Sequence, residues 1–151
     1  MKKVLTTLVC LSILLLASSS LNAQTMSVSG SISSQLTKLH WTPNGVQTTF
    51  HDKWTGDLEG FGHTHLFSSD PLNGETGQIE NIVSAIWLVT PEGNLIFDGL
   101  GSTTGPFLNV VATIRVGTVI YQGAEGQIVL NGVIGPGTVE STYTGTITFN
   151  P

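Results

Sequence analysis

The sequence predicts an all-β protein, either a sandwich or a barrel, and three observations support this. All 18 glycines of the 151-residue chain follow residue 23, which is roughly twice the average usage for what remains. Glycine or a β-branched residue interrupts every window that could form an amphipathic helix. Turn signals separate short runs rich in Val, Ile and Thr, as is typical of sandwiches and barrels. These signals are Pro43-Asn44-Gly45, Asn73-Gly74, Pro91-Glu92-Gly93-Asn94, Gly123-Ala124, Asn131-Gly132 and Pro136-Gly137.

Residues 1–23 are predicted to be a secretory signal peptide, followed by a single domain over residues 24–151. Lys2 and Lys3 supply the positive start, an almost wholly apolar run follows, and small residues end at Ala23, where cleavage is expected. The apolar run is shorter than the ~20 residues that a spanning helix needs, so cleavage is favoured over a retained anchor. We therefore expect an exported protein, periplasmic or extracellular, without membrane attachment after cleavage.

The mature chain is acidic and has no cysteine. Cys10 leaves with the signal, which excludes a disulfide, a thiolate metal site and a cysteine nucleophile. Lys38, Lys53 and Arg115 then stand against ten acidic residues, a net charge of −7. Three scattered cations cannot build the basic face that a nucleic-acid partner requires. Attraction to an anionic membrane surface is unfavourable for the same reason.

A strand is predicted over residues 61–67, and its role depends on which of its two faces points into the protein. Alternation places Phe61, His63, His65 and Phe67 on one face. If that face points inward, two imidazoles between two phenyl rings would line a mostly apolar cavity and contact its ligand. Either histidine could then exchange a proton with that ligand. If the face points to solvent, the opposite face fills the core and the histidines have no such role.

A metal site is a less favoured alternative for the same stretch. His-x-His on a strand puts two imidazoles on one side, about 6.5–7 Å apart at the backbone, and one metal ion can bridge them. His51 could complete a set with His63 and His65, and so could Asp52 or Glu59. The third ligand depends on a strand pairing that the sequence does not reveal, so no metal is assigned.

Residues 82–89 form a predicted strand that is apolar on both faces. Its odd-numbered positions carry Val, Ala, Trp and Val, and its even-numbered positions include two isoleucines and a leucine. Such a strand is normally covered on both faces. In a single-layer barrel the outer cover would come from a terminal segment or a neighbouring subunit, so we expect a homo-oligomer. Glu80, just before this strand, is either a polar group at the barrel mouth or a simple strand start.

Two strands are predicted nearer the C-terminus. Residues 109–121 place five apolar side chains on one face, with Arg115 and Tyr121 on the other. Residues 140–149 alternate between an apolar face with Tyr143 and a face of four threonines, which is the half-buried pattern. Arg115 could anchor a carboxylate ligand or pair with a neighbouring carboxylate. Either tyrosine could offer its hydroxyl to a cavity or pack in the core.

The segment from Gly117 to Leu130, GTVIYQGAEGQIVL, followed by residues 143–147, resembles the signature of the allene oxide cyclase and dirigent barrels. Its aromatic-x-Gly-x-x-Gly core consists of Tyr121, Gly123 and Gly126. The glycines permit positive φ in a tight corner while the aromatic ring closes the barrel end. The resemblance covers the last third of the chain. It implies a small antiparallel, calycin-like β-barrel of about eight strands, an apolar interior, no cofactor and often a trimer.

Three functions follow, of which the first is favoured. The protein is an exported barrel that binds a small apolar or aromatic molecule in its interior. Alternatively, it is a cofactor-independent isomerase or cyclase acting by substrate confinement, since the resembled enzymes steer ring closure of a fatty-acid epoxide or coupling of phenoxy radicals. That enzyme would bring two or three polar candidates to one cavity: His63, His65, Glu80, Tyr121 and Tyr143. The third alternative is a structural or interaction barrel without a ligand. No nucleophile elbow, phosphate loop or dinucleotide fingerprint is present, and no catalytic residue is assigned.

Overall fold

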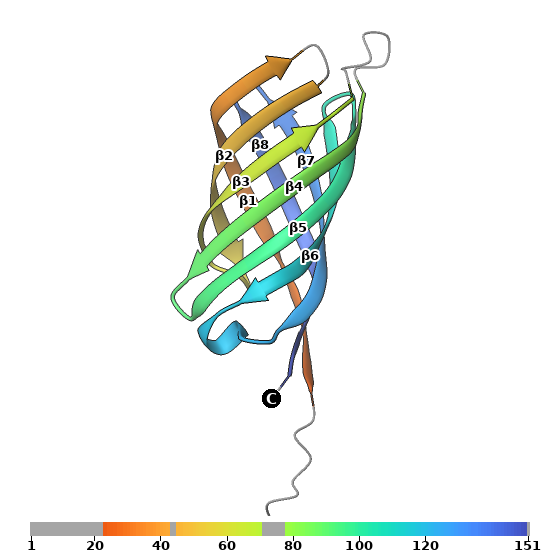
Figure 1. Cartoon of the computed structure of the whole chain (residues 1–151). Helices are drawn as coiled ribbons and strands as arrows, with labels where there is room; N and C mark the ends of the chain where they lie inside the picture. Colours follow the sequence, from red (N-terminus) through yellow and green to blue (C-terminus); the bar gives the residue numbers. More distant parts are fainter. Residues whose placement is uncertain (1–22, 43–44, 71–77, 151) are drawn as a thin grey trace, which may run out of the picture.

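The computed structural model describes residues 23–42, 45–70 and 78–150. Within these ranges the chain forms a closed barrel of eight antiparallel strands, in which β8 pairs with β1 (Figure 1). The predicted all-β fold is confirmed, and the barrel rather than the sandwich is formed. The strands are β1 (Gln24–Thr42), β2 (Gly45–Gly56), β3 (Gly60–Ser68), β4 (Ile79–Thr90), β5 (Gly93–Thr104), β6 (Phe107–Gly117), β7 (Glu125–Gly135) and β8 (Thr138–Phe149), with a short 3₁₀ helix, η1 (Val119–Tyr121), after β6.

Some sequence-based expectations fall on other parts of the chain. The signal predicted over residues 1–23 lies outside the described residues, apart from Ala23. The turn signal Asn73-Gly74 and most of the one at 43–45 also lie outside them. Among the described residues, no helix is long and apolar enough to cross a membrane.

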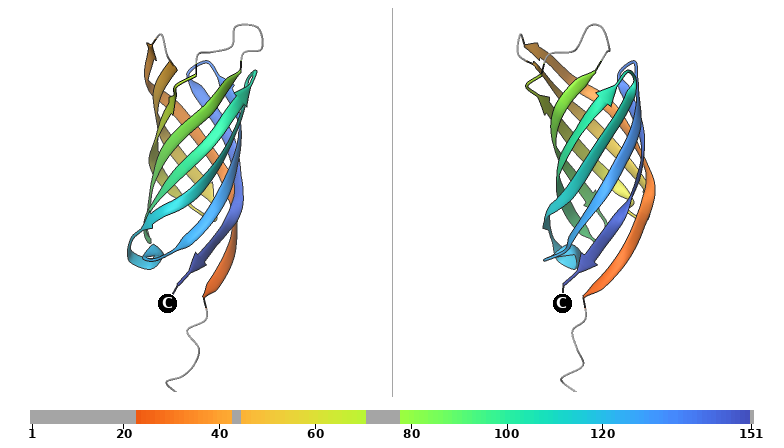
Figure 2. Two further views of the ribbon diagram at one scale, coloured as in Figure 1. Left: turned by 45° about the vertical axis from the view of Figure 1, so that its right-hand side comes forward. Right: turned by 90° about the vertical axis from the view of Figure 1, so that its right-hand side faces the viewer.

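The strands run alternately up and down, so the barrel has two different ends. The lower end carries η1, the β4–β5 turn and the outer termini of β1 and β8. The upper end carries the end of β1, the start of β2 and the β5–β6 and β7–β8 turns. Figure 2 shows from two further sides that the strands are inclined to the barrel axis, as closure of a sheet requires.

The lower half of the interior is solidly packed. The Trp54 ring stacks on Phe97 with a centroid distance of 6.1 Å and lies 5.1 Å from the Tyr143 ring. These three side chains and Leu58 are almost completely buried. Because burial of a large apolar side chain contributes about 1.5–3 kcal/mol, this half supplies much of the hydrophobic stabilisation of the fold.

The corner predicted around Tyr121 closes the lower end. Gly123 has φ +72° and Gly126 has φ +154°, conformations that residues with a side chain rarely adopt. Tyr121 is buried and stacks on Phe149 at a centroid distance of 6.1 Å. The glycines therefore turn the chain while the aromatic ring covers the end of the barrel, as the local sequence predicts.

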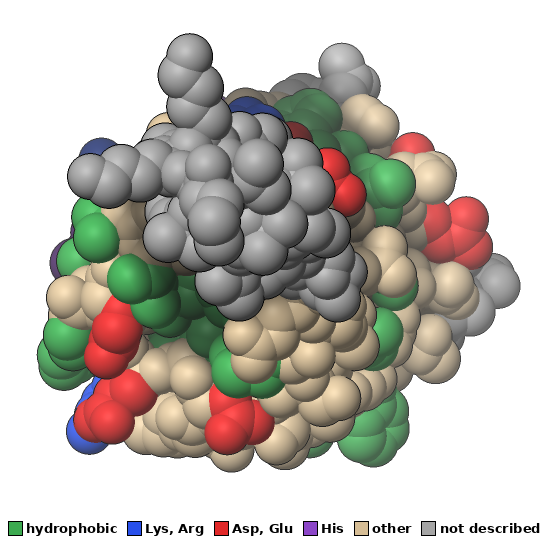
Figure 3. All heavy atoms as spheres, turned by 90° about the horizontal axis from the view of Figure 1, so that it is seen from below, with side chains coloured by type: hydrophobic (Ala, Val, Ile, Leu, Met, Phe, Trp, Pro, Cys, Tyr) green, Lys and Arg blue, Asp and Glu red, His purple; other side chains and the backbone are tan. Residues whose placement is uncertain are grey.

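The outer wall has a polar side and an apolar side. Along β8 and β1 the outward positions are mainly threonine and serine, and they include the four threonines predicted to share a face. From β3 to β6 the outward positions carry large apolar side chains, which are exposed in the single chain. Examples are Phe61, Phe67, Val83, Val89, Leu100 and Phe107. Seen from the lower end, acidic side chains are scattered around the rim between hydrophobic and neutral ones (Figure 3).

Candidate ligand-binding site

The upper half of the barrel interior is hollow. A cavity of about 340 Å³ is lined by inward-facing residues of all eight strands. Most of the lining is aliphatic, with Phe50 near its lower limit, and none of the described residues that line it is charged. At the upper end Leu39, Trp41 and Ile134 line the cavity while remaining partly exposed, Trp41 by 54 %. These three residues therefore mark its mouth.

Two hydroxyl groups on the cavity wall have no hydrogen-bond partner among the described residues. They are the Oγ of Ser84 on β4 and the Oγ1 of Thr48 on β2. Ser84 is only 3 % exposed. The side chain of Ser84 stands against Gly99 of β5, where a Cβ atom would collide with its Oγ. A buried hydroxyl without a partner costs about 1–3 kcal/mol, so both groups suit a ligand that supplies the missing hydrogen bond.

A carboxylate lies just below the cavity. Asp52 on β2 points into the barrel and is 3 % exposed. Its Oδ2 accepts a 2.6 Å hydrogen bond from the hydroxyl of Thr64 on β3, and Thr64 lines the cavity. The Oδ1 of Asp52 has no partner among the described residues. Ser34, the register partner of Asp52 on β1, also lines the cavity, so its floor carries two hydroxyl groups among apolar side chains.

The sequence carries a signal for this floor in the alternation of β2. Among the sequence-based candidates Asp52 is only a possible metal ligand, and Thr48, Thr64 and Ser84 are not candidates at all. Asp52 has the same parity as Trp54, and a tryptophan in an alternating strand normally faces the core. That parity places the carboxylate inside the barrel.

The histidine stretch lies on the outer wall. Phe61, His63, His65 and Phe67 share one face as alternation predicts, but this face points outward and all four residues are exposed. The smaller side chains between them turn inward, where Thr64 and Leu66 line the cavity. Cavity lining by the two histidines required the opposite orientation. The prediction that His63 and His65 line the interior cavity with Phe61 and Phe67 is therefore wrong.

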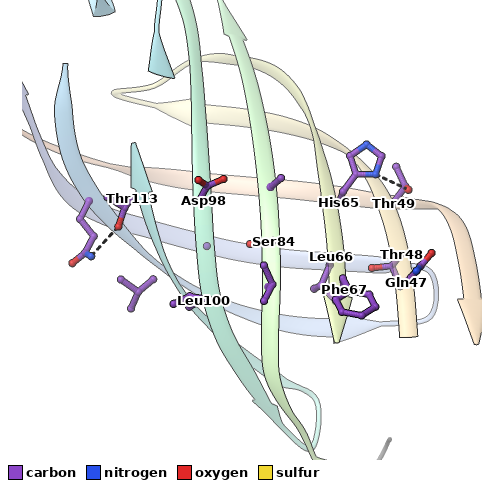
Figure 4. Close-up of a pocket in the computed structure, with 15 residues that line it drawn as sticks. Gln47, Thr48, Thr49, His65, Leu66, Phe67, Ser84, Asp98, Leu100 and Thr113 are labelled. Atoms are coloured by element: carbon purple, nitrogen blue, oxygen red, sulfur yellow. Dashed lines mark hydrogen bonds between the residues drawn. The ribbon is translucent and has the colours of Figure 1, made fainter. Parts of the chain in front are cut away.

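On the outer wall each histidine has an aromatic neighbour. The His63 ring lies 4.6 Å from that of His51, and the His65 ring lies 5.2 Å from that of Trp87. Figure 4 shows His65 beside Thr49, joined by a 3.2 Å hydrogen bond between Nδ1 and Oγ1. Among the described residues, no group of three or more His, Cys, Asp or Glu side chains could hold a metal ion. His51, His63 and His65 therefore form no three-ligand set.

A second hollow, of about 700 Å³, lies on this outer wall (Figure 4). It is lined mainly by outward side chains from β2 to β7, among them His65, Phe67, Val83 and Leu100. Its lining also includes Thr48, Leu66 and Ser84, which it shares with the interior cavity. These four outward side chains are exposed, Leu100 by 67 %, so the hollow is an open groove. A small molecule would stay largely in contact with water there. The smaller interior cavity is the better candidate because most of the residues that line it are buried or half-buried, so a ligand there is shielded from water on more sides.

The remaining candidates do not meet at one place. Tyr143 is buried in the packed lower half, and Tyr121 lies at the lower end. Glu80 is exposed at the start of β4, and the described cavity lining does not include it. Arg115 pairs with Asp98 of the neighbouring strand β5, with 3.4 Å between Nη1 and Oδ1. Of the two alternatives predicted for Arg115, the structure shows the pairing with a neighbouring carboxylate.

The hydroxyl of Tyr143 serves the fold. It accepts a 2.8 Å hydrogen bond from the backbone N–H of Leu58 and donates to the carbonyl of Thr55 at 3.2 Å. Burial raises the pKa of the Tyr143 phenol, and the hydrogen bond from Leu58 opposes this effect only in part. The tyrosine therefore fastens the β2–β3 turn to the packed core.

Comparison with protein-family models, with curated proteins and with solved structures finds no match to this chain. The resemblance of its last third to the allene oxide cyclase and dirigent barrels stays a prediction. The site must therefore be interpreted from its own geometry.

Proposed function

We propose that this protein binds a small apolar molecule inside the upper half of its barrel. The observation that carries the proposal is the cavity of about 340 Å³ with aliphatic walls and unpartnered hydroxyls. Protein interiors are normally packed with few voids larger than a water molecule. A hollow of this size departs from that packing, and it lies within the range usual for small-molecule sites, about 300–1,000 Å³.

The same observation separates this function from its alternatives. A barrel with a purely structural role gains stability from a filled interior, as in the lower half of this protein. A hollow upper half therefore favours binding. The enzyme alternative relied on polar candidates that converge on one cavity, and these candidates are dispersed over the outer wall, the packed core and the lower end. No arrangement of them favours catalysis.

Binding of the neutral fluorescent probe N-phenyl-1-naphthylamine to the mature protein tests the proposal. The fluorescence intensity of this probe rises in apolar surroundings, so it reports binding inside the cavity. Ser84→Leu places additional methyl groups in the cavity and should weaken probe binding at least tenfold. Ala85→Leu is the matched control, since residue 85 faces outward on the same strand and should bind as the wild type does. Circular dichroism should show the same fold in all three proteins.

Two results would reject the proposal. The first is a wild-type protein that does not bind the probe. The second is equal binding by the Ser84→Leu and Ala85→Leu variants. Native mass spectrometry of protein purified from its natural host adds an independent measurement. An organic mass that is retained in the native state and lost on unfolding is expected.

A further inference from the structure

The cavity floor also points to the chemical class of the ligand. We infer that the ligand carries a hydrogen-bond-donating head group, an alcohol, a phenol or an amine, which lies against Thr64, whose hydroxyl is hydrogen-bonded to Asp52. An apolar remainder extends toward the mouth. This inference rests on the proposed function, and it excludes a carboxylate as the preferred head group.

The hydrogen bond between Thr64 and Asp52 sets the polarity of the floor. A threonine hydroxyl has one proton and two acceptor positions. The proton of Thr64 is directed to Asp52 Oδ2, at 2.6 Å. The Thr64 oxygen can then only accept a hydrogen bond from a molecule in the cavity, and a head group that binds there must donate one.

Asp52 strengthens this preference by its charge. It is the one buried acidic or basic side chain among the described residues, apart from the tyrosine phenols. Within those ranges the only ion pair is the one between Arg115 and Asp98 on the outer wall, so no cation accompanies Asp52. A buried carboxylate oxygen without a partner is costly, and a donor on the ligand would reduce that cost. A ligand carboxylate would bring a second negative charge next to it.

The size of the cavity limits the rest of the ligand. At roughly 30 Å³ for each water-sized group, about 340 Å³ accommodates about eleven such groups. A ten-carbon chain or ring system with one polar atom has that size. With the head at Thr64, the remainder would contact the aliphatic walls and end near Trp41 at the mouth.

Displacement of N-phenyl-1-naphthylamine by four ten-carbon compounds tests the inference: 1-decanol, decylamine, decanoate and decane. At pH 7 the wild-type protein should bind the alcohol and the amine at least tenfold more tightly than decanoate. Decane, which has no head group, should bind more weakly than the alcohol. Comparable binding of decanol and decanoate, within about threefold, would overturn the inference while leaving the proposed function intact. If the probe itself does not bind, the proposed function fails as well.

Two variants locate the effect. Asp52→Asn keeps the shape but removes the charge and adds an N–H₂ donor, so it should reduce the alcohol-to-decanoate preference at least fivefold. Asp98→Asn makes the same change on the outer wall and should leave the preference unchanged. An Asp52→Asn protein with the wild-type preference would contradict the inference. The wild-type series decides the question even if this variant does not fold.

Discussion

Replacement of Tyr143 by phenylalanine tests how the barrel holds its lower end. The substitution removes one oxygen atom and leaves the ring beside Trp54. The backbone N–H of Leu58 then loses its partner at 2.8 Å, in a place where both residues are almost completely buried. The weaker hydrogen bond to the carbonyl of Thr55, at 3.2 Å, is lost as well.

The expected loss of stability follows from the backbone N–H of Leu58, which has no hydrogen-bond partner in the variant. A buried N–H without a partner costs about 1–3 kcal/mol, so we expect a decrease of about 2 kcal/mol in the free energy of unfolding. For a domain of this size each kcal/mol lowers the melting temperature by roughly 3–4 °C, which predicts a decrease of about 7 °C. Urea denaturation and calorimetry of the mature protein measure both quantities.

Tyr121→Phe is the matched control. Tyr121 is also buried at the lower end, but no hydrogen bond of its hydroxyl is found among the described residues. The same chemical change there should cost less than about 0.5 kcal/mol. Equal effects of the two substitutions, or a loss below about 0.5 kcal/mol for Tyr143→Phe, would refute the role assigned to the Tyr143 hydroxyl.

The pKa of Tyr143 gives the same hydroxyl a pH signature. Burial raises this pKa above the ordinary tyrosine value of about 10, because the phenolate is disfavoured in the core. The unfolded chain therefore releases this proton at a lower pH than the folded one. The corresponding stabilisation is complete below pH 10 and is lost as the pH rises through the folded pKa. The Tyr143→Phe variant has no phenol at this position and does not lose this contribution to the free energy of unfolding. The difference in the free energy of unfolding between wild type and variant should therefore narrow above pH 10.

Three further predictions concern other parts of the barrel. Gly30 faces the Tyr143 ring, and a Cβ atom there would meet the Thr55 carbonyl and lie 2.6 Å from the ring carbon that bears the hydroxyl. Gly30→Ala should cost about 2 kcal/mol or more in urea denaturation, and an unchanged midpoint would contradict this packing. Arg115→Ala removes an ion pair whose side chains are about half exposed, so its cost should stay below about 1 kcal/mol in the same assay. The exposed apolar face from β3 to β6 predicts association with a second copy of the chain. Val83→Lys should weaken this association. A wild-type protein that is monomeric by light scattering at all concentrations would count against the prediction.

Alternation along the sequence predicted much of this fold because side chains on a strand have a period of two. It correctly separated Tyr143 from the four threonines of β8 and grouped Phe61 with the two histidines. The glycines after Tyr121 correctly indicated a corner. These features are local, and a single strand or turn determines them.

The direction in which a face points could not be obtained in the same way. For residues 61–67 both faces contain apolar side chains, so the period identifies the faces but not the interior one. The choice depends on the register with β2 and β4, which brings Gly62 opposite Asp52 and Leu88. The cavity floor is difficult to predict from the sequence for a related reason. Buried residues are usually apolar, so an aspartate inside a barrel is unexpected. The one sequence feature that indicates it is that Asp52 and Trp54 lie on the same face of β2.

The pairing of β1 with β8 has a practical consequence. Gln24 and Phe149 are register partners, so the chain enters and leaves the barrel at its lower end (Figure 1). The cavity mouth, which Trp41 marks, lies at the upper end. A tag or a tether attached through either terminus would therefore hold the barrel by its closed end. Immobilised on a sensor surface in this way, the protein would present its opening to the solution, and ligand exchange could be followed without steric interference from the attachment.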